Sequence, residues 1–327
     1  MILAGDIGGT STRLALFQNS GDAVQVVAVE RYASRSYPGL SEIVRLFTTA
    51  HPQPIDAAAF GIAGPVRDGR VETPNLPWVI DASALRAQLS VPRVTLLNDL
   101  EANAWGVFTL GAADVATLSP GAPDCYGNAA IISAGTGLGE AGYHANGSGL
   151  VPFASEGGHA DFAPHDELTI DLFRWLHRRH GHVSWERVVS GPGLVNIFTF
   201  LHEVKHGEVS AELADAMREG DPAAAISSAA LDGTSALAVS ALDLFVALYG
   251  AEAGNLALKM KATRGVWIGG GIAPKILPRL QRPGFLEAFH DKGRFRAFLE
   301  AIPVRVILND QTALRGAAAW QVQAGSA

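Results

Sequence analysis

The sequence predicts an α/β protein built from two units, and three observations carry that prediction. Strand-like apolar runs alternate with helical patterns over the first hundred residues. Two glycine-rich turns, at residues 8–10 and 135–137, follow the same plan of strand, turn and strand, which indicates an internal duplication. The chain has 327 residues, enough for two domains or one bilobed unit.

The first unit is expected to open on a β-hairpin, because only a short turn separates its first two strands. A helix is predicted where apolar residues recur at helical spacing, and short apolar runs predict the later strands. The predicted elements are strands at Ile2–Ala4, Arg13–Phe17, Val24–Arg31, Ala57–Ile62 and Val94–Leu97, and helices at Ser41–Ala50 and Leu100–Phe108.

The second unit is expected to begin near Asn128, after a loop at Leu118–Asn128 that is rich in proline and glycine. A mostly helical stretch from Asp166 to Lys261 separates its early strands from its late ones. The predicted elements are strands at Ala129–Ser133, Ala141–His144, Val266–Ile268 and Val304–Leu308, and a C-terminal helix at Gln311–Gln323.

Composition excludes several function classes. The chain is 48% hydrophobic and 17% charged, as expected for a globular protein, and its net charge is -7. Without a long basic run, a nucleic-acid or anionic-membrane surface is not expected. The single cysteine, Cys125, cannot form an internal disulfide, which is compatible with a reducing cytoplasm. No signal-peptide pattern is found, and Ala236–Lys259 is expected to be a buried helix, not a membrane span.

The first glycine turn has the chemistry of a phosphate site. Glycines let the backbone approach a bound group, and consecutive free N–H groups form an anion-binding nest. Thr10 adds a hydroxyl donor, and Asp6 is expected to hold Mg²⁺ through water. The alternative is a plain hairpin turn. The nucleotide-binding residues predicted here are Gly5, Asp6, Ile7, Gly8, Gly9 and Thr10.

Two further glycine turns extend this prediction. Gly135, Thr136 and Gly137 repeat the chemistry in the second unit, while Gly269, Gly270 and Gly271 would let a flat ring lie against the backbone. The alternative for the last turn is a tight strand-to-helix connection before Pro274. Neither the dinucleotide-binding fingerprint nor the P-loop pattern occurs.

Asn98 and Asp99 close an apolar strand, and strand ends are where open α/β sheets bind ligands. A carboxylate at this place can accept the proton of a hydroxyl group that attacks phosphorus. The alternative is that either residue caps the helix that follows.

A second polar cluster has the composition of a sugar site. Glu156 and His159 flank two glycines, which allow both side chains to face one small ligand, and Glu186 follows at a predicted helix start. Buried sugar hydroxyls need both donors and acceptors. For Glu186 the alternative is a first-turn glutamate that the helix dipole favours. The histidines at 177, 180 and 182 are interpreted as a solvated helix end before Gly181, not as metal ligands.

Together these motifs resemble bacterial glucokinases of the type that lacks the zinc motif of the ROK (repressor, open reading frame, kinase) family. The resemblance spans nearly the whole chain, and the stretch Ser155–Phe162 is its most specific part. Actins, heat-shock chaperones and many sugar kinases share the glycine turns. One departure is Ser133-Ala134, where relatives often have Gly-Pro.

The resemblance implies an actin-like ATPase (ribonuclease H-like) α/β fold with two lobes and a central cleft. It implies a small lobe of residues 1–107 with 309–327, a large lobe of residues 108–308, and a homodimer. It implies ATP with Mg²⁺ as donor. Glucose would be bound by Asn98, Asp99, Glu156, His159 and Glu186, with Asp99 as the general base.

Two other interpretations remain open. A ROK kinase or repressor would need a cysteine cluster for zinc, which one cysteine cannot supply, and a repressor would need an N-terminal helix-turn-helix where this chain has a predicted strand. A chaperone-like ATPase would need no small polar pocket, so Glu156 and His159 argue against it. ADP or polyphosphate as donor, and mannose or glucosamine as acceptor, also stay open.

Overall fold

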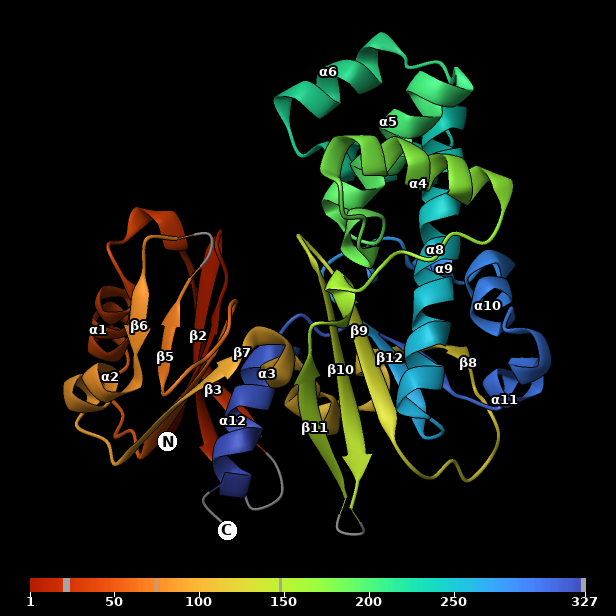
Figure 1. Ribbon diagram of the computed structural model, residues 1–327. Helices are drawn as coiled ribbons and strands as arrows, with labels where there is room; N and C mark the ends of the chain where they lie inside the picture. Colours follow the sequence, from red (N-terminus) through yellow and green to blue (C-terminus); the bar gives the residue numbers. More distant parts are fainter. Residues whose placement is uncertain (20–23, 74–75, 147–148, 325–327) are drawn as a thin grey trace. The chain divides into compact units, whose positions relative to one another are not determined.

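The computed structural model describes residues 1–19, 24–73, 76–146 and 149–324. The chain divides into two compact units, each with its own main sheet (Figure 1). Each unit also has its own hydrophobic core. The first unit combines Met1–Asp114 with Asn309–Ala327, and the second is Val115–Leu308.

The first unit is a five-stranded sheet with helices on both faces. Its elements are β1 (Ile2–Ile7), β2 (Ser11–Asn19), β3 (Val24–Ala33), η1 (Ser34–Ser36), α1 (Leu40–Ala50), β4 (Ala57–Ile62), β5 (Arg70–Glu72), β6 (Val79–Asp81), α2 (Ala82–Leu89), β7 (Arg93–Asn98), α3 (Asp99–Gly106), η2 (Val107–Thr109), η3 (Ala112–Asp114) and α12 (Thr312–Ala324). The strand order is β3-β2-β1-β4-β7. Strands β1, β4 and β7 are parallel, and the hairpin partner β2 is antiparallel to β1. Apolar side chains of α1 and α2 cover one face, and those of α3 and α12 cover the other.

Two glycines fasten the C-terminal helix to the first unit. A Cβ atom at Gly316 would overlap the carbonyl oxygen of Ala102, and one at Gly106 would overlap that of Thr312. Helices α3 and α12 therefore pack with their backbones in contact, which only glycine permits. This contact explains why the end of the chain folds with its beginning.

The second unit has a six-stranded sheet and a large helical part. Its elements are β8 (Val115–Ser119), β9 (Ala129–Ala134), β10 (Leu138–Ala145), β11 (Leu150–Ser155), η4 (Gly157–His159), α4 (Glu167–His180), η5 (Trp185–Arg187), α5 (Gly191–Lys205), α6 (Ala211–Glu219), α7 (Pro222–Leu231), α8 (Ala236–Met260), β12 (Gly265–Gly269), α9 (Leu277–Leu280), α10 (Pro283–His290), η6 (Gly293–Phe295), α11 (Arg296–Glu300) and β13 (Val304–Ile307). The order β11-β10-β9-β12-β13-β8 repeats the plan of the first sheet, with β9, β12 and β13 parallel. The predicted duplication is therefore seen in the topology.

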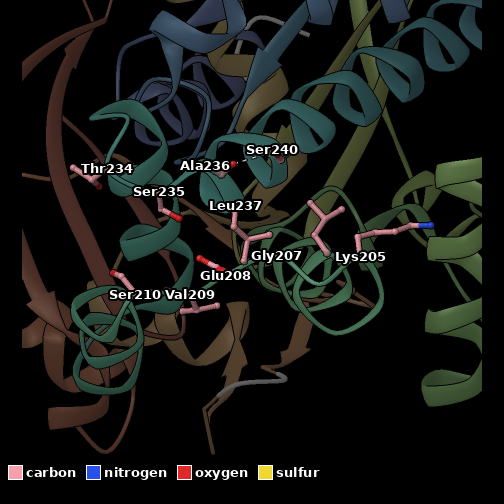
Figure 2. A pocket seen from close by; sticks show the side chains of 11 residues that line it. Lys205, Gly207, Glu208, Val209, Ser210, Thr234, Ser235, Ala236, Leu237 and Ser240 are labelled. Carbon is pink, nitrogen blue, oxygen red and sulfur yellow. Dashed lines mark hydrogen bonds between the residues drawn. The ribbon is translucent and has the colours of Figure 1, made fainter.

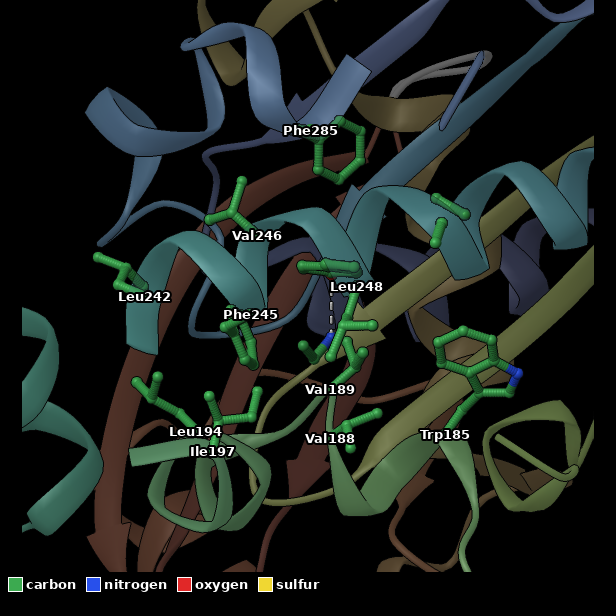
Figure 3. Close-up of a cluster of buried hydrophobic side chains, with 14 of the residues drawn as sticks. Trp185, Val188, Val189, Leu194, Ile197, Leu242, Phe245, Val246, Leu248 and Phe285 are labelled. Atoms are coloured by element: carbon green, nitrogen blue, oxygen red, sulfur yellow. Dashed lines mark hydrogen bonds between the residues drawn. The ribbon is translucent and has the colours of Figure 1, made fainter. Parts of the chain in front are cut away.

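Helix α8 is the centre of the second core (Figure 3). Its side chains Leu242, Phe245 and Leu248 pack with Trp185, Val188 and other apolar groups from the segment between α4 and α5. By length and composition α8 is the one helix among the described residues that could cross a membrane, but 67% of its most apolar window is buried inside the unit. That burial is the arrangement predicted for a core helix.

The predicted elements are mostly found, with different ends. Strand β4 has the predicted bounds, whereas β10 begins earlier than predicted, at Leu138. The prediction of a helix around Pro274 was wrong, because turns occupy the chain until α9 begins at Leu277. Part of the expected loop at Leu118–Asn128 belongs to the strand β8.

Candidate active site

The carboxyl ends of three parallel strands meet at one edge of the first sheet. Asp6 of β1 pairs with Gly61 of β4, and Asn98 ends the neighbouring strand β7. A Cβ atom at Gly61 would lie 3.7 Å from Cα of Asp99, so the start of α3 comes close to this strand end. The structure therefore brings the turn at residues 8–10 together with Asn98 and Asp99.

The first glycine turn is both a hairpin turn and a source of free donors. The N–H of Gly8 donates to the carbonyl oxygen of Ser11 at 3.0 Å, and Ser34 Oγ donates to the carbonyl oxygen of Gly8 at 2.7 Å. In the described part of the chain, the N–H groups of Gly9 and Thr10 have no backbone acceptor. Two adjacent amides are thus left for an anion.

Gly5 and Ile7 have structural reasons for their places. A Cβ atom at Gly5 would lie 2.5 Å from Cδ1 of Phe60, so glycine is needed for packing inside the sheet. The side chain of Ile7 is 2% exposed and belongs to the core. Packing thus explains both residues, and their part in nucleotide binding stays a prediction.

Asp6 carries an electrostatic cost that a cation would relieve. Burial raises the pKa of Asp6 to about 6, Arg13 opposes the rise, and the charges of Asp99 and Asp310 add to it. Arg13 is itself paired with Asp310, at 2.9 Å between Nη1 and Oδ2. No group of three or more metal-ligating side chains occurs among the described residues. One carboxylate suits Mg²⁺ that keeps most of its water shell.

Asn98 is the N-cap of α3, so the capping alternative is confirmed for this residue. Its Oδ1 accepts the N–H of Leu100 at 3.0 Å, and its Nδ2 donates to the carbonyl oxygen of Gly64 at 3.2 Å. Both atoms keep one further hydrogen-bonding position. The N–H of Leu100 also donates to Oδ1 of Asp99 at 2.9 Å, which fixes the orientation of that carboxylate at the helix start.

The second and third glycine turns are neighbours at one edge of the second sheet. They follow the parallel strands β9 and β12, and Gly269 pairs with Ser133. Gly270 has φ of +82°, and a Cβ atom there would overlap the carbonyl oxygen of Ala134. Nothing lies within 4 Å of the corresponding position at Gly271, so this residue faces open space.

A buried tyrosine fastens these two turns together. The hydroxyl of Tyr249, in α8, accepts the N–H of Ala134 at 3.1 Å and lies 3.2 Å from the carbonyl oxygen of Gly269. The N–H of Gly191 donates to the carbonyl oxygen of Gly135 at 2.8 Å, which ties α5 to the same place. In the described residues the N–H groups of Thr136 and Gly137 have no backbone acceptor, as in the first turn.

Glu186 contacts the second glycine turn. Its Oε2 accepts the N–H of Leu138 at 3.0 Å, and a Cβ atom at Gly137 would overlap that oxygen. Glu186 lies in the single 3₁₀ turn η5, not in the first turn of an α-helix. Glu186 is therefore held by a specific hydrogen bond, and the alternative of a glutamate placed only by a helix dipole does not describe it.

The structure brings Glu156 and His159 close to this contact. Both side chains are exposed. Glu156 is the N-cap of the turn η4 and His159 is its last residue, and a Cβ atom at Gly158 would overlap the carbonyl oxygen of Leu138. The N–H of Trp185 donates to the carbonyl oxygen of Ala160 at 3.0 Å and so joins η4 to η5. The segments that carry the predicted sugar residues of the second unit thus both contact Leu138, the residue after the second glycine turn.

Sequence reasoning missed a buried acid beneath this cluster. Glu140 in β10 is 1% exposed and lies against Gly157. A glutamate within an apolar strand, at a position that alternation turns inward, was the available signal. The histidine cluster is as predicted: His177 and His180 are exposed in the last turn of α4.

One surface pocket lies apart from the predicted site. It has a volume of about 600 Å³, and its lining includes Lys205, Glu208, Ser210 and Ser235 near the end of α5 and the start of α8 (Figure 2). None of the predicted site residues lines it.

Comparison with known proteins agrees with the motifs. The family model for glucokinase matches residues 3–324. The chain is 43% identical to a glucokinase of a Nostoc species, over 97% of this chain and 98% of that protein, and 35% identical to a glucokinase of Caulobacter vibrioides, over 97% and 93%.

Solved structures show the same fold. A glucokinase from an Antarctic psychrotroph matches with a TM-score of 0.86 and 30% identity, over 98% of both chains. A ROK family glucokinase from Streptomyces griseus, in complex with glucose and AMPPNP, matches with a TM-score of 0.65 and 22% identity, over 98% of this chain and 99% of that one. The fold is that of the actin-like ATPases, as predicted.

Proposed function

This chain belongs to the glucokinase family, and we propose that it transfers the γ-phosphoryl group of ATP to the 6-hydroxyl of glucose, giving ADP and glucose 6-phosphate. The observation that carries the proposal is the grouping of Glu156, His159 and Glu186 around the second glycine turn. The same set of contacts thereby holds the groups proposed to bind sugar and the amides proposed to bind phosphate.

Asp99 is proposed as the general base. The 6-hydroxyl must lose its proton as its oxygen attacks phosphorus, and a carboxylate within hydrogen-bond reach can accept it. The hydrogen bond from the N–H of Leu100 orients the carboxylate at the start of α3. Asn98, whose amide is fixed by Gly64 and Leu100, would offer its remaining donor and acceptor positions to the sugar.

The glycine turns are proposed to bind the triphosphate through backbone amides. Gly9, Thr10, Thr136 and Gly137 supply donors, and Gly269–Gly271 would lie against the adenine ring. Asp6 would hold Mg²⁺ through water, because Arg13, which is itself paired with Asp310, only partly offsets the cost of burying its charge. The ion, when bound, would neutralise charge that develops on the phosphates.

The donor, the compartment and the assembly are part of the proposal. ATP is favoured by the AMPPNP complex of the Streptomyces griseus relative. We expect a cytoplasmic enzyme, where ATP is abundant, and the homodimer that the family resemblance implies. A membrane or nucleic acid as partner is not expected from the acidic net charge of -7.

The experiment is a coupled assay of ADP release over a panel of sugars and donors. Glucose with ATP should give the highest kcat/KM, and ADP release without sugar should be slow. A general ATPase would release ADP at the same rate with and without sugar, whereas a hexose kinase of another specificity would prefer mannose or glucosamine.

A further inference from the structure

Two buried glutamates lie beneath the turn that carries Glu156 and His159. Glu140, in β10, is 1% exposed, and Glu252, in the middle of α8, is 0% exposed. Their side chains are hydrogen-bonded to each other. Neither residue has a part in the function proposed above.

The hydrogen-bond partners determine which glutamate holds a proton. Glu252 accepts from Nδ2 of Asn255 at 2.8 Å and from Nζ of Lys259 at 2.9 Å, so both of its oxygens are acceptors. A hydrogen bond between two carboxyl groups needs one proton, and the donors Asn255 and Lys259 favour its place on Glu140, because they stabilise the carboxylate form of Glu252. The Oε1 atom of Glu140 is buried with no partner in the described residues. A neutral carboxyl group tolerates that place far better than a carboxylate does.

The surrounding charges favour the same assignment. Burial raises the pKa of Glu140 to about 8, the charge of Glu252 adds to the rise, and Lys259 opposes it. Burial also raises the pKa of Glu252, but the hydrogen bonds from Asn255 and Lys259 pull it down.

Two other ionisable groups face the pair. Tyr249, on the same helix as Glu252, is fully buried and its pKa is raised by burial, so it stays neutral. Lys292, after α10, is near enough to Glu252 for the two charges to attract, and it therefore supports the ionised form of Glu252. Lys259 and Lys292 thus both favour the ionised form of Glu252.

Glu140 also supports the turn through its side chain and its backbone. A Cβ atom at Gly157 would overlap Oε2 of Glu140, so the turn rests on the carboxyl group without a gap. Ser155 Oγ donates to the carbonyl oxygen of Glu140 at 3.0 Å and accepts the N–H of Gly157 at 3.2 Å. The segment that presents Glu156 and His159 is therefore fixed by Glu140.

We propose that Glu140 is a positioning residue for sugar binding, whose protonated carboxyl group, hydrogen-bonded to Glu252, holds the Glu156–His159 turn in its binding geometry. This inference rests on the function proposed above. Loss of the proton places two negative charges side by side in an apolar environment. Their repulsion moves the Glu140 carboxyl group, on which Gly157 rests. Glucose affinity then falls as pH rises, while turnover at saturating glucose changes less.

The test compares Glu140→Gln and Glu140→Leu with the wild type from pH 6 to 9. Glutamine keeps the volume and a donor toward Glu252 but cannot ionise, whereas leucine lacks the donor. In the wild type the KM for glucose should rise about tenfold between pH 7 and pH 9, because only about a tenth of Glu140 stays protonated one unit above its pKa. The KM of Glu140→Gln should stay flat, that of Glu140→Leu should be raised at every pH, and the KM for ATP should be the same in all three.

A sugar-free measurement makes the proposal independent of activity. Amide hydrogen exchange over residues 155–160 should be faster in the wild type than in Glu140→Gln at pH 9, and equal at pH 7. Equal exchange at both pH values, or an equal alkaline rise in KM in both proteins, would overturn the positioning role. If Glu140→Leu fails to fold, the comparison of wild type with Glu140→Gln still decides. A wild type without glucose kinase activity would refute the proposed function while the exchange result still tests Glu140.

Discussion

Glu186 and Leu138 are joined by a hydrogen bond of 3.0 Å, in which Oε2 of the glutamate accepts the backbone N–H. Leu138 begins the strand after the second glycine turn, and its carbonyl oxygen is covered by Gly158 of the neighbouring turn. One backbone unit therefore links the phosphate-binding turn to both segments that carry the predicted sugar residues.

Because of this link, substitutions of Glu156 and Glu186 should have different effects on substrate binding. Glu156→Ala should raise the KM for glucose with little change in the KM for ATP, because Glu156 is exposed and, unlike Glu186, has no hydrogen bond to the second glycine turn among the described residues. Glu186→Ala should raise both, because it also leaves the N–H of Leu138 without its charged acceptor, a loss of about 1–3 kcal/mol. Steady-state kinetics with each substrate varied checks the difference. An unchanged KM for ATP in Glu186→Ala would contradict the structural link.

Asp99→Asn should lower kcat by about 10²–10⁴, because an amide cannot accept the hydroxyl proton. The substitution is nearly isosteric and keeps an oxygen for the Leu100 N–H, so the melting temperature should change little. Asp56→Asn, which alters an exposed carboxylate of the same unit, serves as the control. Near wild-type turnover in a folded Asp99→Asn protein would reject the assignment of the base.

Removal of Mg²⁺ should stop phosphoryl transfer without unfolding the protein. Chelation should abolish activity, added Mg²⁺ should restore it, and the melting temperature should be the same throughout. Asp6→Asn should raise the Mg²⁺ concentration for half-maximal activity about tenfold, since the carboxylate proposed to hold the ion through water loses its charge. Stoichiometric zinc in the purified protein, lost together with stability on chelation, would overturn this account of the metal.

The third glycine turn offers a matched pair of substitutions. Gly270→Ala should destabilise the protein by about 2 kcal/mol or more, because φ is +82° and the new Cβ would overlap Ala134. Gly271→Ala should leave the melting temperature unchanged but raise the KM for ATP, since its Cβ would point into open space where the ring is expected. Gly284→Ala, with nothing within 4 Å, is the control. Equal destabilisation of both variants would contradict the packing described.

The pair of Glu140 and Glu252 should make stability depend on pH. The ordinary pKa of Glu140 is 4.5 and its pKa in the folded protein is about 8, so between these values the folded state binds more protons than the unfolded one. The unfolding free energy should therefore fall as pH rises through this interval, by at most about 1.4 kcal/mol per pH unit. Denaturant titrations of wild type and Glu140→Gln at pH 5, 7 and 9 measure it, and a constant difference between the two would refute it.

Much of the fold followed from periodicity and glycine placement. Strand β4 and the two strand–turn–strand repeats were predictable because apolar runs and glycines are local signals. Short strands such as β5 and β6, of three residues each, carry too few residues to show alternation. In the stretch before α9, the N–H of Ile272 donates to the carbonyl oxygen of Ala134 at 3.3 Å, and this partner is not local in sequence.

At the candidate site, the residue types were easier to predict from the sequence than the role of each residue. Asn98 and Asp99 were placed correctly at a strand end. Which of them caps α3, and how the other is oriented, depends on hydrogen bonds to Gly64 and Leu100. The contact of Glu186 with Leu138 spans about fifty residues of sequence, and the partnership of Glu140 with Glu252 spans more than a hundred. Such pairings are set by tertiary packing and leave no local pattern.

The most direct test of the proposed activity identifies the product with glucose and with 6-deoxyglucose, which lacks the acceptor hydroxyl. With ATP, Mg²⁺ and glucose, phosphorus NMR should show a phosphate ester coupled to the protons on carbon 6, in amounts equal to the ADP released. With 6-deoxyglucose, ADP release should fall to the slow sugar-free rate. Rapid ADP release with 6-deoxyglucose, or a phosphate on another carbon of glucose, would contradict the assignment of this chain as a kinase of the glucose 6-hydroxyl.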